Sequence, residues 1–221
     1  MSRINADFTK ELALDTHAMA WAPSPLAGVE RKMLDRIGCE VARATSLVRY
    51  GPGCHFSEHV HGGGEEFLVL EGVFSDERGH YGPLCYVRNP PGSRHRPHSE
   101  QGCILFVKLQ QFLPGDDRQL VLDTASLAFE KTAWPGVSLL PLHRYRQESV
   151  YLLRLAPGAT VPAGGLAMAE ILVLEGELGG RDRGHWLRGP RLGERDWHSE
   201  KGGLCYVKSA LVMTQGPGSQ P

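Results

Sequence analysis

The stretch that decides the fold is GCHFSEHVHGGGEEFLVLEG, residues 53–72. It fits the pattern G-x5-H-x-H-x3-E-x6-G, in which two glycines bracket His59, His61 and Glu65. Residues two apart on a strand point to the same face, so both histidines can project inward at one end of a small barrel. The three glycines at 62–64 let the chain turn closely past this point, and the Glu65 carboxylate can return to it.

A second segment, PPGSRH at residues 90–95, supplies a fourth side chain. It reads P-x-G-x2-H and places His95 after a rigid Pro-Gly turn. Neutral imidazoles combined with one carboxylate suit Fe(II), Mn(II), Ni(II), Cu(II) or Zn(II), and they would be wrong for Ca or Mg. The sequence therefore predicts a site for one divalent transition metal ion, with the ligands His59, His61, Glu65 and His95.

The composition favours short strands joined by tight turns. Of 221 residues, 27 are glycine and 15 are proline, and the apolar runs are short and bounded by turn residues. We therefore expect an all-β fold of antiparallel strands in a sandwich or barrel. Only residues 7–17 and 123–129 are predicted as short helices. Residues 215–221, QGPGSQP, are predicted to form a frayed end.

An internal repeat divides the chain. Residues 66–72 read EFLVLEG and residues 170–176 read EILVLEG, and several flanking segments recur in the same order. Each unit spans roughly 90 residues, which is too long for a solenoid repeat and about right for a small domain. We predict two tandem domains, a metal-binding one at 1–112 and a second one at 113–221.

Charge and cysteine content exclude several classes of protein. The formal net charge is −1, which leaves no excess of positive charge for nucleic acid or for an anionic membrane surface. No stretch approaches the roughly 18 apolar residues of a spanning helix, and the first residues are too polar for a signal peptide. The five cysteines are scattered and never spaced as CxxC. We therefore expect a cytoplasmic protein with reduced thiols.

The two histidine motifs resemble the signature motifs of the cupin superfamily. The segments GGGEEFLVLEGVFSDERGHY (62–81) and YVRNPPGSRHRPHSEQGCILFVKL (86–109) closely resemble the cupin domain of the ChrR-like anti-sigma factor family. This resemblance implies a jelly-roll barrel in each half. It also implies a metal, zinc in the nearest members, held by His59, His61, Glu65 and His95.

The chain departs from that family in one respect. In the family's anti-sigma proteins a helical domain with its own zinc site precedes the cupin, whereas here about 20 residues precede Trp21. A sigma factor is therefore not expected as a partner. The resemblance to this family also implies a homodimer.

The second half lacks the ligands. Where the first half has EHVHGGGEE, the second has PAGGLAMAE. Ala163 and Gly165 occupy the two histidine positions. Ala169 stands at the position of Glu65, and Arg195 at the position of His95. A metal site of the first kind cannot form with these side chains. We therefore expect the second barrel to be structural, or to bind something without a metal.

Some neighbouring residues could assist the site. Glu66 competes with Glu65 as the ligand, but the parity shared with the histidines favours Glu65. The residues predicted to line the pocket or to contact the ligands are His55, Phe67, Tyr86 and His98.

Two functions fit this sequence. In the first, the protein binds a small molecule or senses an oxidant, and a closed tetrahedral site favours zinc. In the second, the protein is a metal-dependent dioxygenase that cleaves a diketone or a hydroxyacetophenone-like substrate, as related Fe(II) cupins do. Both need one Zn, Fe, Ni or Mn ion as cofactor and a small molecule as partner.

Overall fold

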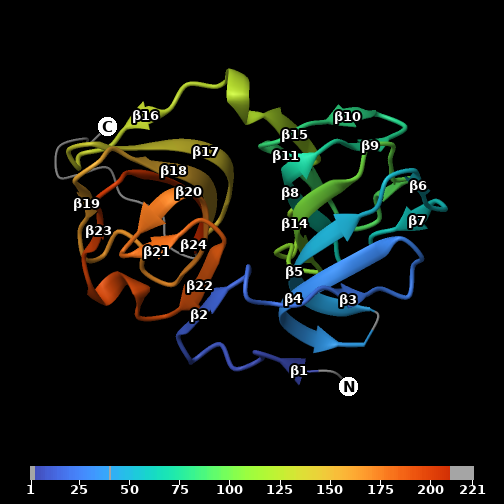
Figure 1. Ribbon diagram of the computed structural model, residues 1–221, viewed down its shortest axis with the longest axis horizontal. Coiled ribbons are helices and arrows are strands. Elements are labelled where there is room, and N and C mark those ends of the chain that lie inside the picture. The colour runs from blue at the N-terminus through green and yellow to red at the C-terminus, as the bar shows by residue number, and fades with distance from the viewer. Residues whose placement is uncertain (1–2, 40, 210–221) are drawn as a thin grey trace. The chain divides into compact units, whose positions relative to one another are not determined.

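Strands make up nearly all of the regular structure in residues 3–39 and 41–209, the part of the chain that the computed structural model describes (Figure 1). Within these residues the helical elements are two short 3-10 turns, Thr124–Ser126 and Leu192–Glu194. The all-β prediction is confirmed. No helix in this part is long and apolar enough to cross a membrane. The predicted frayed end at 215–221 lies outside the described residues.

The chain forms two compact units, each made of two segments. Unit 1 comprises Met1–Ala6 and Met19–Ser126, and unit 2 comprises Asp7–Ala18 and Leu127–Pro221. All five cysteines are unpaired, as expected.

Unit 1 contains a large sheet in the order β1-β4-β5-β14-β8-β11-β15, with β3 paired to β4. A smaller sheet, β10-β9-β13-β6, and the pair β12-β7 complete the unit. The bounds are β1 Arg3–Ile4, β3 Ala22–Pro23, β4 Val29–Gly38, β5 Ala42–Tyr50, β6 Cys54–His55, β7 His59–Val60, β8 Glu65–Gly72, β9 Phe74–Asp76, β10 Gly79–Tyr81, β11 Cys85–Asn89, β12 Arg94–His95, β13 His98–Ser99, β14 Cys103–Leu109 and β15 Leu120–Asp123.

Unit 2 repeats the large sheet in the order β16-β17-β18-β24-β20-β22-β2, with β21 paired to β20, and adds the pair β19-β23. The central strands of the two sheets follow the same order, β4-β5-β14-β8-β11 and β17-β18-β24-β20-β22, as the sequence repeat predicts. The bounds are β2 Leu12–Asp15, β16 Glu130–Lys131, β17 Val137–Tyr145, β18 Glu148–Leu155, β19 Ala159–Val161, β20 Ala169–Leu178, β21 Arg181–Asp182, β22 His185–Gly189, β23 Trp197–Ser199 and β24 Gly203–Ser209.

The units differ from a linear division between residues 112 and 113 because two outer strands lie on the other side of that division from the sheet they join. Strand β2 precedes residue 112 but pairs with β22 in unit 2, and β15 follows residue 113 but pairs with β11 in unit 1. The helix predicted at 7–17 is wrong, since the alternating sequence LALD forms β2 with every second residue half-buried. Of the helix predicted at 123–129, only the 3-10 turn forms.

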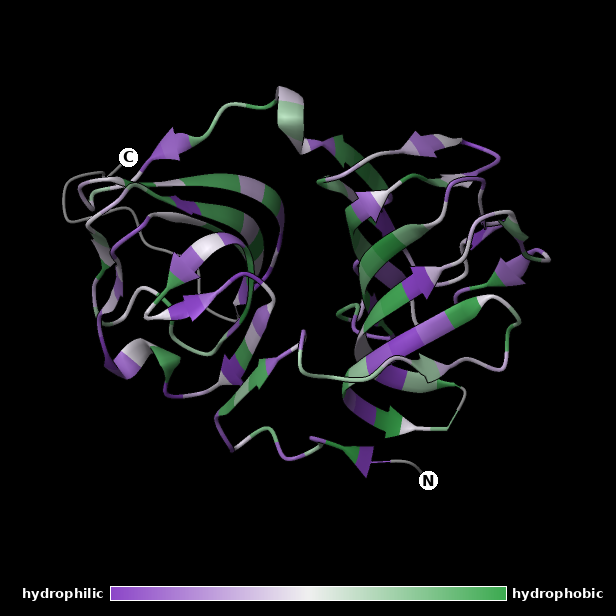
Figure 2. Ribbon diagram, viewed as in Figure 1, coloured by the Kyte–Doolittle hydropathy of each residue, from purple (hydrophilic) through white to green (hydrophobic). Residues whose placement is uncertain are grey.

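The interior of unit 1 is the face of the large sheet that carries Phe67 and Val69. Strand β8 is paired on both sides, by β14 and β11, and Phe67 and Val69 pack into one buried cluster with Phe74, Tyr81 and Leu105. Aromatic and branched side chains fit such a pleated, buried surface. Figure 2 shows hydrophobic residues along the central strands and hydrophilic residues over much of β4.

Candidate metal centre

Two short paired strands and one turn bring the predicted ligands together. Strand β7 pairs with β12 so that His59 lies directly opposite His95. The chain then turns through Gly64, whose φ is +80° and where an added Cβ would lie 2.4 Å from the Phe112 ring. This turn delivers Glu65 to the start of β8. Glycine is needed here both for its backbone conformation and for the close approach of the ring.

The nitrogen atoms of the three imidazoles converge. The Nε2 atoms of His59 and His61 lie 3.2 Å apart, and the ligand atoms of these two residues and of His95 all lie within 4.8 Å of one another. The Oε2 atom of Glu65 is 3.4 Å from His61 Nε2 and 3.7 Å from His95 Nε2. His61 and His95 are buried, whereas His59 is exposed. The site is therefore enclosed on one side and open to solvent on the other.

The opposite ring nitrogen of each histidine lies close to an oxygen. His59 Nδ1 is 3.4 Å from the Ser57 carbonyl, and His61 Nδ1 is 3.1 Å from Ser93 Oγ. His95 Nδ1 is 3.3 Å from Asp76 Oδ2. A proton held at Nδ1 leaves the Nε2 lone pair free for a metal, which is how histidine ligands are oriented in metalloproteins.

Asp76 on β9 contacts a candidate ligand, His95, and the sequence reasoning missed it. Its carboxylate is buried, and its Oδ1 accepts hydrogen bonds from the Tyr81 hydroxyl and from the Arg78 backbone N–H, each at 2.8 Å. Burial raises the pKa of Asp76, but the hydrogen bonds from His95, Arg78 and Tyr81 outweigh it and leave the pKa below its usual value. Asp76 is therefore an anion that faces His95.

The two buried histidines have opposite pKa shifts. Burial lowers the pKa of His61, and His95 and His59 add to this effect against the opposing charge of Glu65. Burial also disfavours the charged form of His95, but the hydrogen bond to Asp76 and the charges of Glu65 and Asp76 raise its pKa above the usual value. His61 is thus neutral at pH 7, whereas a metal at His95 has to compete with a proton.

The choice between Glu65 and Glu66 follows from the face that each occupies. Glu65 accepts a 3.3 Å hydrogen bond from the side-chain amide of Asn89 and lies beside the imidazoles. Glu66 is on the opposite face of β8, where it forms a 2.5 Å ion pair with the buried Arg88. The expectation that Glu65 rather than Glu66 faces the histidines is therefore supported by the opposite faces that the two residues occupy on β8.

The four residues predicted to line the pocket or to contact the ligands do not share one face of the fold. Phe67 lies in the interior cluster. Tyr86 is a correction, because it pairs with Leu68 and so lies on the other face, with its hydroxyl 3.4 Å from Arg88. His55 and His98 are also corrected. They pair with each other and stack with ring centroids 5.3 Å apart. The pairing of His98 with Ser75 directs both away from the interior face that carries Phe74 and Asp76.

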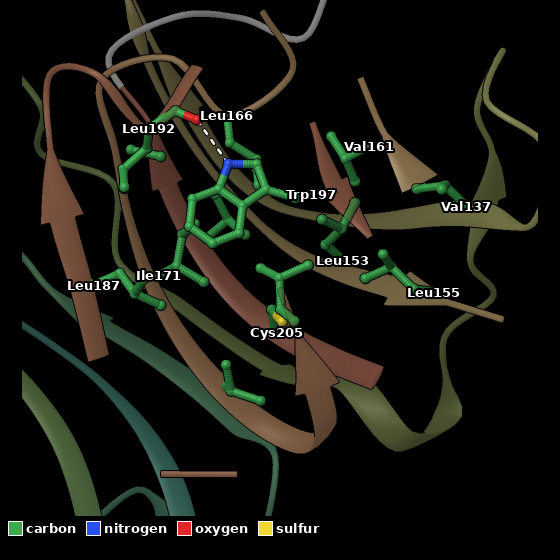
Figure 3. Close-up of a cluster of buried hydrophobic side chains, with 14 of the residues drawn as sticks. Val137, Leu153, Leu155, Val161, Leu166, Ile171, Leu187, Leu192, Trp197 and Cys205 are labelled. Atoms are coloured by element: carbon green, nitrogen blue, oxygen red, sulfur yellow. Dashed lines mark hydrogen bonds between the residues drawn. The ribbon is translucent and has the colours of Figure 1, made fainter. Parts of the chain in front are cut away.

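Unit 2 has an apolar core where unit 1 has its ligands (Figure 3). Trp197 stands among Leu166 and Ile171, and its indole N–H donates a 2.6 Å hydrogen bond to the Leu192 carbonyl. Arg195, the counterpart of His95, forms an ion pair with Glu11 instead. In the described residues of unit 2 considered by itself, no group of imidazoles, thiols and carboxylates converges in this way.

The fold and the converging side chains define the class of protein. Two tandem jelly-roll units, one with three imidazoles and a carboxylate directed inward, are the architecture of a double cupin. More particularly, residues 9–113 match the model of the ChrR cupin-like domain. This segment is a ChrR cupin-like domain, so the resemblance found in the sequence is confirmed. No curated protein sequence matches the chain.

Solved structures share the fold at low sequence identity. A candidate dioxygenase from Nostoc punctiforme is 16% identical with a TM-score of 0.76, covering 97% of this chain and 88% of its own. The Escherichia coli pirin YhhW in complex with nickel(II) is 13% identical with a TM-score of 0.65, covering 92% and 100%. A mutant of the Bacillus subtilis oxalate decarboxylase OxdC is 9% identical with a TM-score of 0.61, covering 90% and 77%. These likenesses establish the cupin fold of both units over the described residues.

Proposed function

We propose that unit 1 binds one divalent transition metal ion through His59, His61, His95 and Glu65, and that the protein uses it to bind a small molecule. The observation that carries this proposal is the orientation of the imidazoles, since each Nδ1 faces an oxygen while the Nε2 atoms converge. Nitrogen lone pairs directed at one point beside a carboxylate repel one another unless a cation or a proton lies between them.

The donor set also limits which metals fit. Three imidazoles and one carboxylate suit Zn, Fe, Ni or Mn and not Ca. A bound metal would supply Lewis acidity toward an oxygen of the ligand. The chain's own residues would orient the imidazoles through Asp76 and Ser93 and would enclose the ligand within the barrel. The exposed side of His59 leaves a route for a small molecule to enter.

A second candidate function is metal-dependent oxygenation of such a molecule. It is favoured by the hydrogen bond from Asn89 to Glu65, which gives the carboxylate another partner when it is not a ligand. A metal held by three histidines alone has more open positions for substrate and oxygen than one held by four residues.

The test of the metal site is elemental analysis by mass spectrometry of protein purified without a histidine tag. We expect about one metal ion per chain in the wild type, and loss of the metal in the double variant His59→Ala, His61→Ala. The matched controls are Ala163→Ser and Arg195→Ala, at the corresponding positions of unit 2, and they should retain it. A double variant that still holds one ion per chain would refute the assignment.

An oxygen-electrode trace on the same samples separates the two functions. Bound zinc with no oxygen uptake on a panel of diketones supports the binding protein. Bound iron with uptake supports the oxygenase, and the double variant should then lose that uptake together with the metal.

A further inference from the structure

Tyr50, the last residue of β5, faces the interior of unit 1. It pairs with Cys103 on β14 and with Val29 on β4. Directly opposite residues of an antiparallel pair project to the same face, and Cys103 belongs to the interior cluster, against which Tyr50 itself packs. The large sheet therefore places a phenol inside the barrel that carries the candidate metal ligands.

Aromatic neighbours hold this phenol beside the site. The ring of Tyr50 packs edge-on against Phe56, with centroids 5.2 Å apart, and against Phe74, with centroids 5.6 Å apart. The Phe74 ring is in turn 5.8 Å from the His95 ring. Tyr50 is thus separated from a candidate ligand by a single aromatic ring. Edge-to-face packing on two sides restricts where its hydroxyl can point.

The hydroxyl of Tyr50 forms no hydrogen bond with any described residue, and it is not among the fully enclosed polar atoms without a partner. The residue is partly buried, and its ring lies among apolar neighbours. Burial raises the pKa of Tyr50, and the nearby carboxylate of Glu65 raises it further. The phenol therefore keeps its proton at neutral pH and remains a donor. Water, or a ligand oxygen that displaces it, can accept a hydrogen bond from this hydroxyl.

The duplicated unit offers an internal comparison. The counterpart of Tyr50 is Leu155, which occupies the same register between Val137 and Gly203. Leu155 lies in the continuous apolar core of unit 2, which has no counterpart of the ligands. The interior hydroxyl at this position is therefore present in the barrel that has the ligands and absent from the barrel that lacks them.

A second interior position changes in the same way. Arg31 on β4 pairs with Val48, which packs against the interior cluster of unit 1. Its counterpart, Leu139, pairs with Leu153 and packs against the core of unit 2. The interior face of unit 1 therefore carries an arginine where unit 2 has a leucine.

We propose that Tyr50 is the specificity-determining residue of the unit 1 site, and that its hydroxyl donates a hydrogen bond to a small planar ligand with two oxygens, a carboxylate or an enolised 1,3-dicarbonyl. One oxygen of the ligand is directed at the metal ligands, and the phenol positions the other. This assignment rests on the proposed function, because the metal anchors the ligand.

The test compares the wild type with Tyr50→Phe by titration calorimetry on metal-loaded protein, with benzoate and pentane-2,4-dione as the probes. We expect the substitution to weaken binding of at least one probe about tenfold, while metal content and melting temperature stay unchanged. The difference between the two probes identifies which kind of oxygen ligand the site prefers. The matched control is Tyr151→Phe, whose buried hydroxyl in unit 2 also lacks a partner among the described residues. It should leave both affinities unchanged.

Three results would overturn the assignment. Equal affinities in the wild type and in Tyr50→Phe would remove the role of the phenol, and metal-loaded wild type that binds neither probe would remove the ligand class. Wild type that retains no metal would refute the proposed function and, with it, the anchor on which this inference depends. Metal analysis of each sample distinguishes this last failure from the first two.

Discussion

Replacing Asp76 by asparagine should weaken metal binding without removing any ligand. In the wild type, Asp76 Oδ1 accepts hydrogen bonds from Tyr81 and Arg78, while Oδ2 faces Nδ1 of His95. An asparagine that keeps both donors on its carbonyl oxygen places its amide group against the imidazole. The amide then donates to Nδ1 and puts the histidine proton on Nε2, which is the wrong tautomer for a ligand.

The size of the effect follows from the contacts. Loss of a carboxylate partner of a histidine ligand lowers metal affinity about 10- to 100-fold, which is roughly 1.4–2.8 kcal/mol. The side chain of Asp76 is only 1% exposed, so water cannot readily replace it, and we expect the upper half of this range. The assay is competition with a chromophoric chelator, run at fixed pH and supported by elemental analysis.

Glu177→Gln is the matched control for this prediction. Glu177 is a buried carboxylate of unit 2 that accepts hydrogen bonds from the backbone N–H groups of Gly180 and Glu200. Its replacement should lower thermal stability and leave metal affinity unchanged. The reasoning about Asp76 would be refuted if Asp76→Asn bound the metal as tightly as wild type, or if the control lost as much affinity.

Two further predictions concern pH and the core of unit 2. Because the pKa of His95 is raised in the folded state, its contribution to the free energy of unfolding of metal-free protein should be complete below about pH 6.5 and lost as the pH rises through the folded-state pKa. Metal affinity should rise over that same range as the competing proton leaves His95. The measurement is metal affinity between pH 6 and 8, and an affinity that does not change with pH would contradict this reasoning. Trp197→Ala should cost about 3–5 kcal/mol in urea unfolding, because it leaves a cavity among Leu166 and Ile171 and an unpaired Leu192 carbonyl. Its metal content should match wild type, and an equal loss of metal would contradict the separate roles of the two barrels.

The candidate ligands could be predicted from the sequence because they depend on local spacing. His59 and His61 share a face by parity, and three glycines allow Glu65 to return to them. The partners across strands could not be predicted in this way. Asp76 meets His95 only because β9 and β12 come together in the folded barrel, and no short pattern connects them.

The errors have a related cause. Tyr86 lies outside the predicted pocket because its strand parity relative to Phe67 depends on the register of β11 against β8, which the sequence alone does not specify. The helix predicted at 7–17 failed because strand β2 is defined by a distant partner, β22. A sequence signal for this strand exists, since LALD at residues 12–15 recurs as LVLD at 120–123, and both segments form edge strands in equivalent places.

The pairing of β2 with β22 has a consequence for biosynthesis. Leu12 is made 176 residues before its partner Arg188. Strand β2 therefore remains unpaired while unit 1 is synthesised, and contacts so distant in sequence form slowly. A nascent chain stalled before residue 185 would carry an apolar strand available for pairing with another chain. Chaperone demand during translation should accordingly fall only when β22 has emerged.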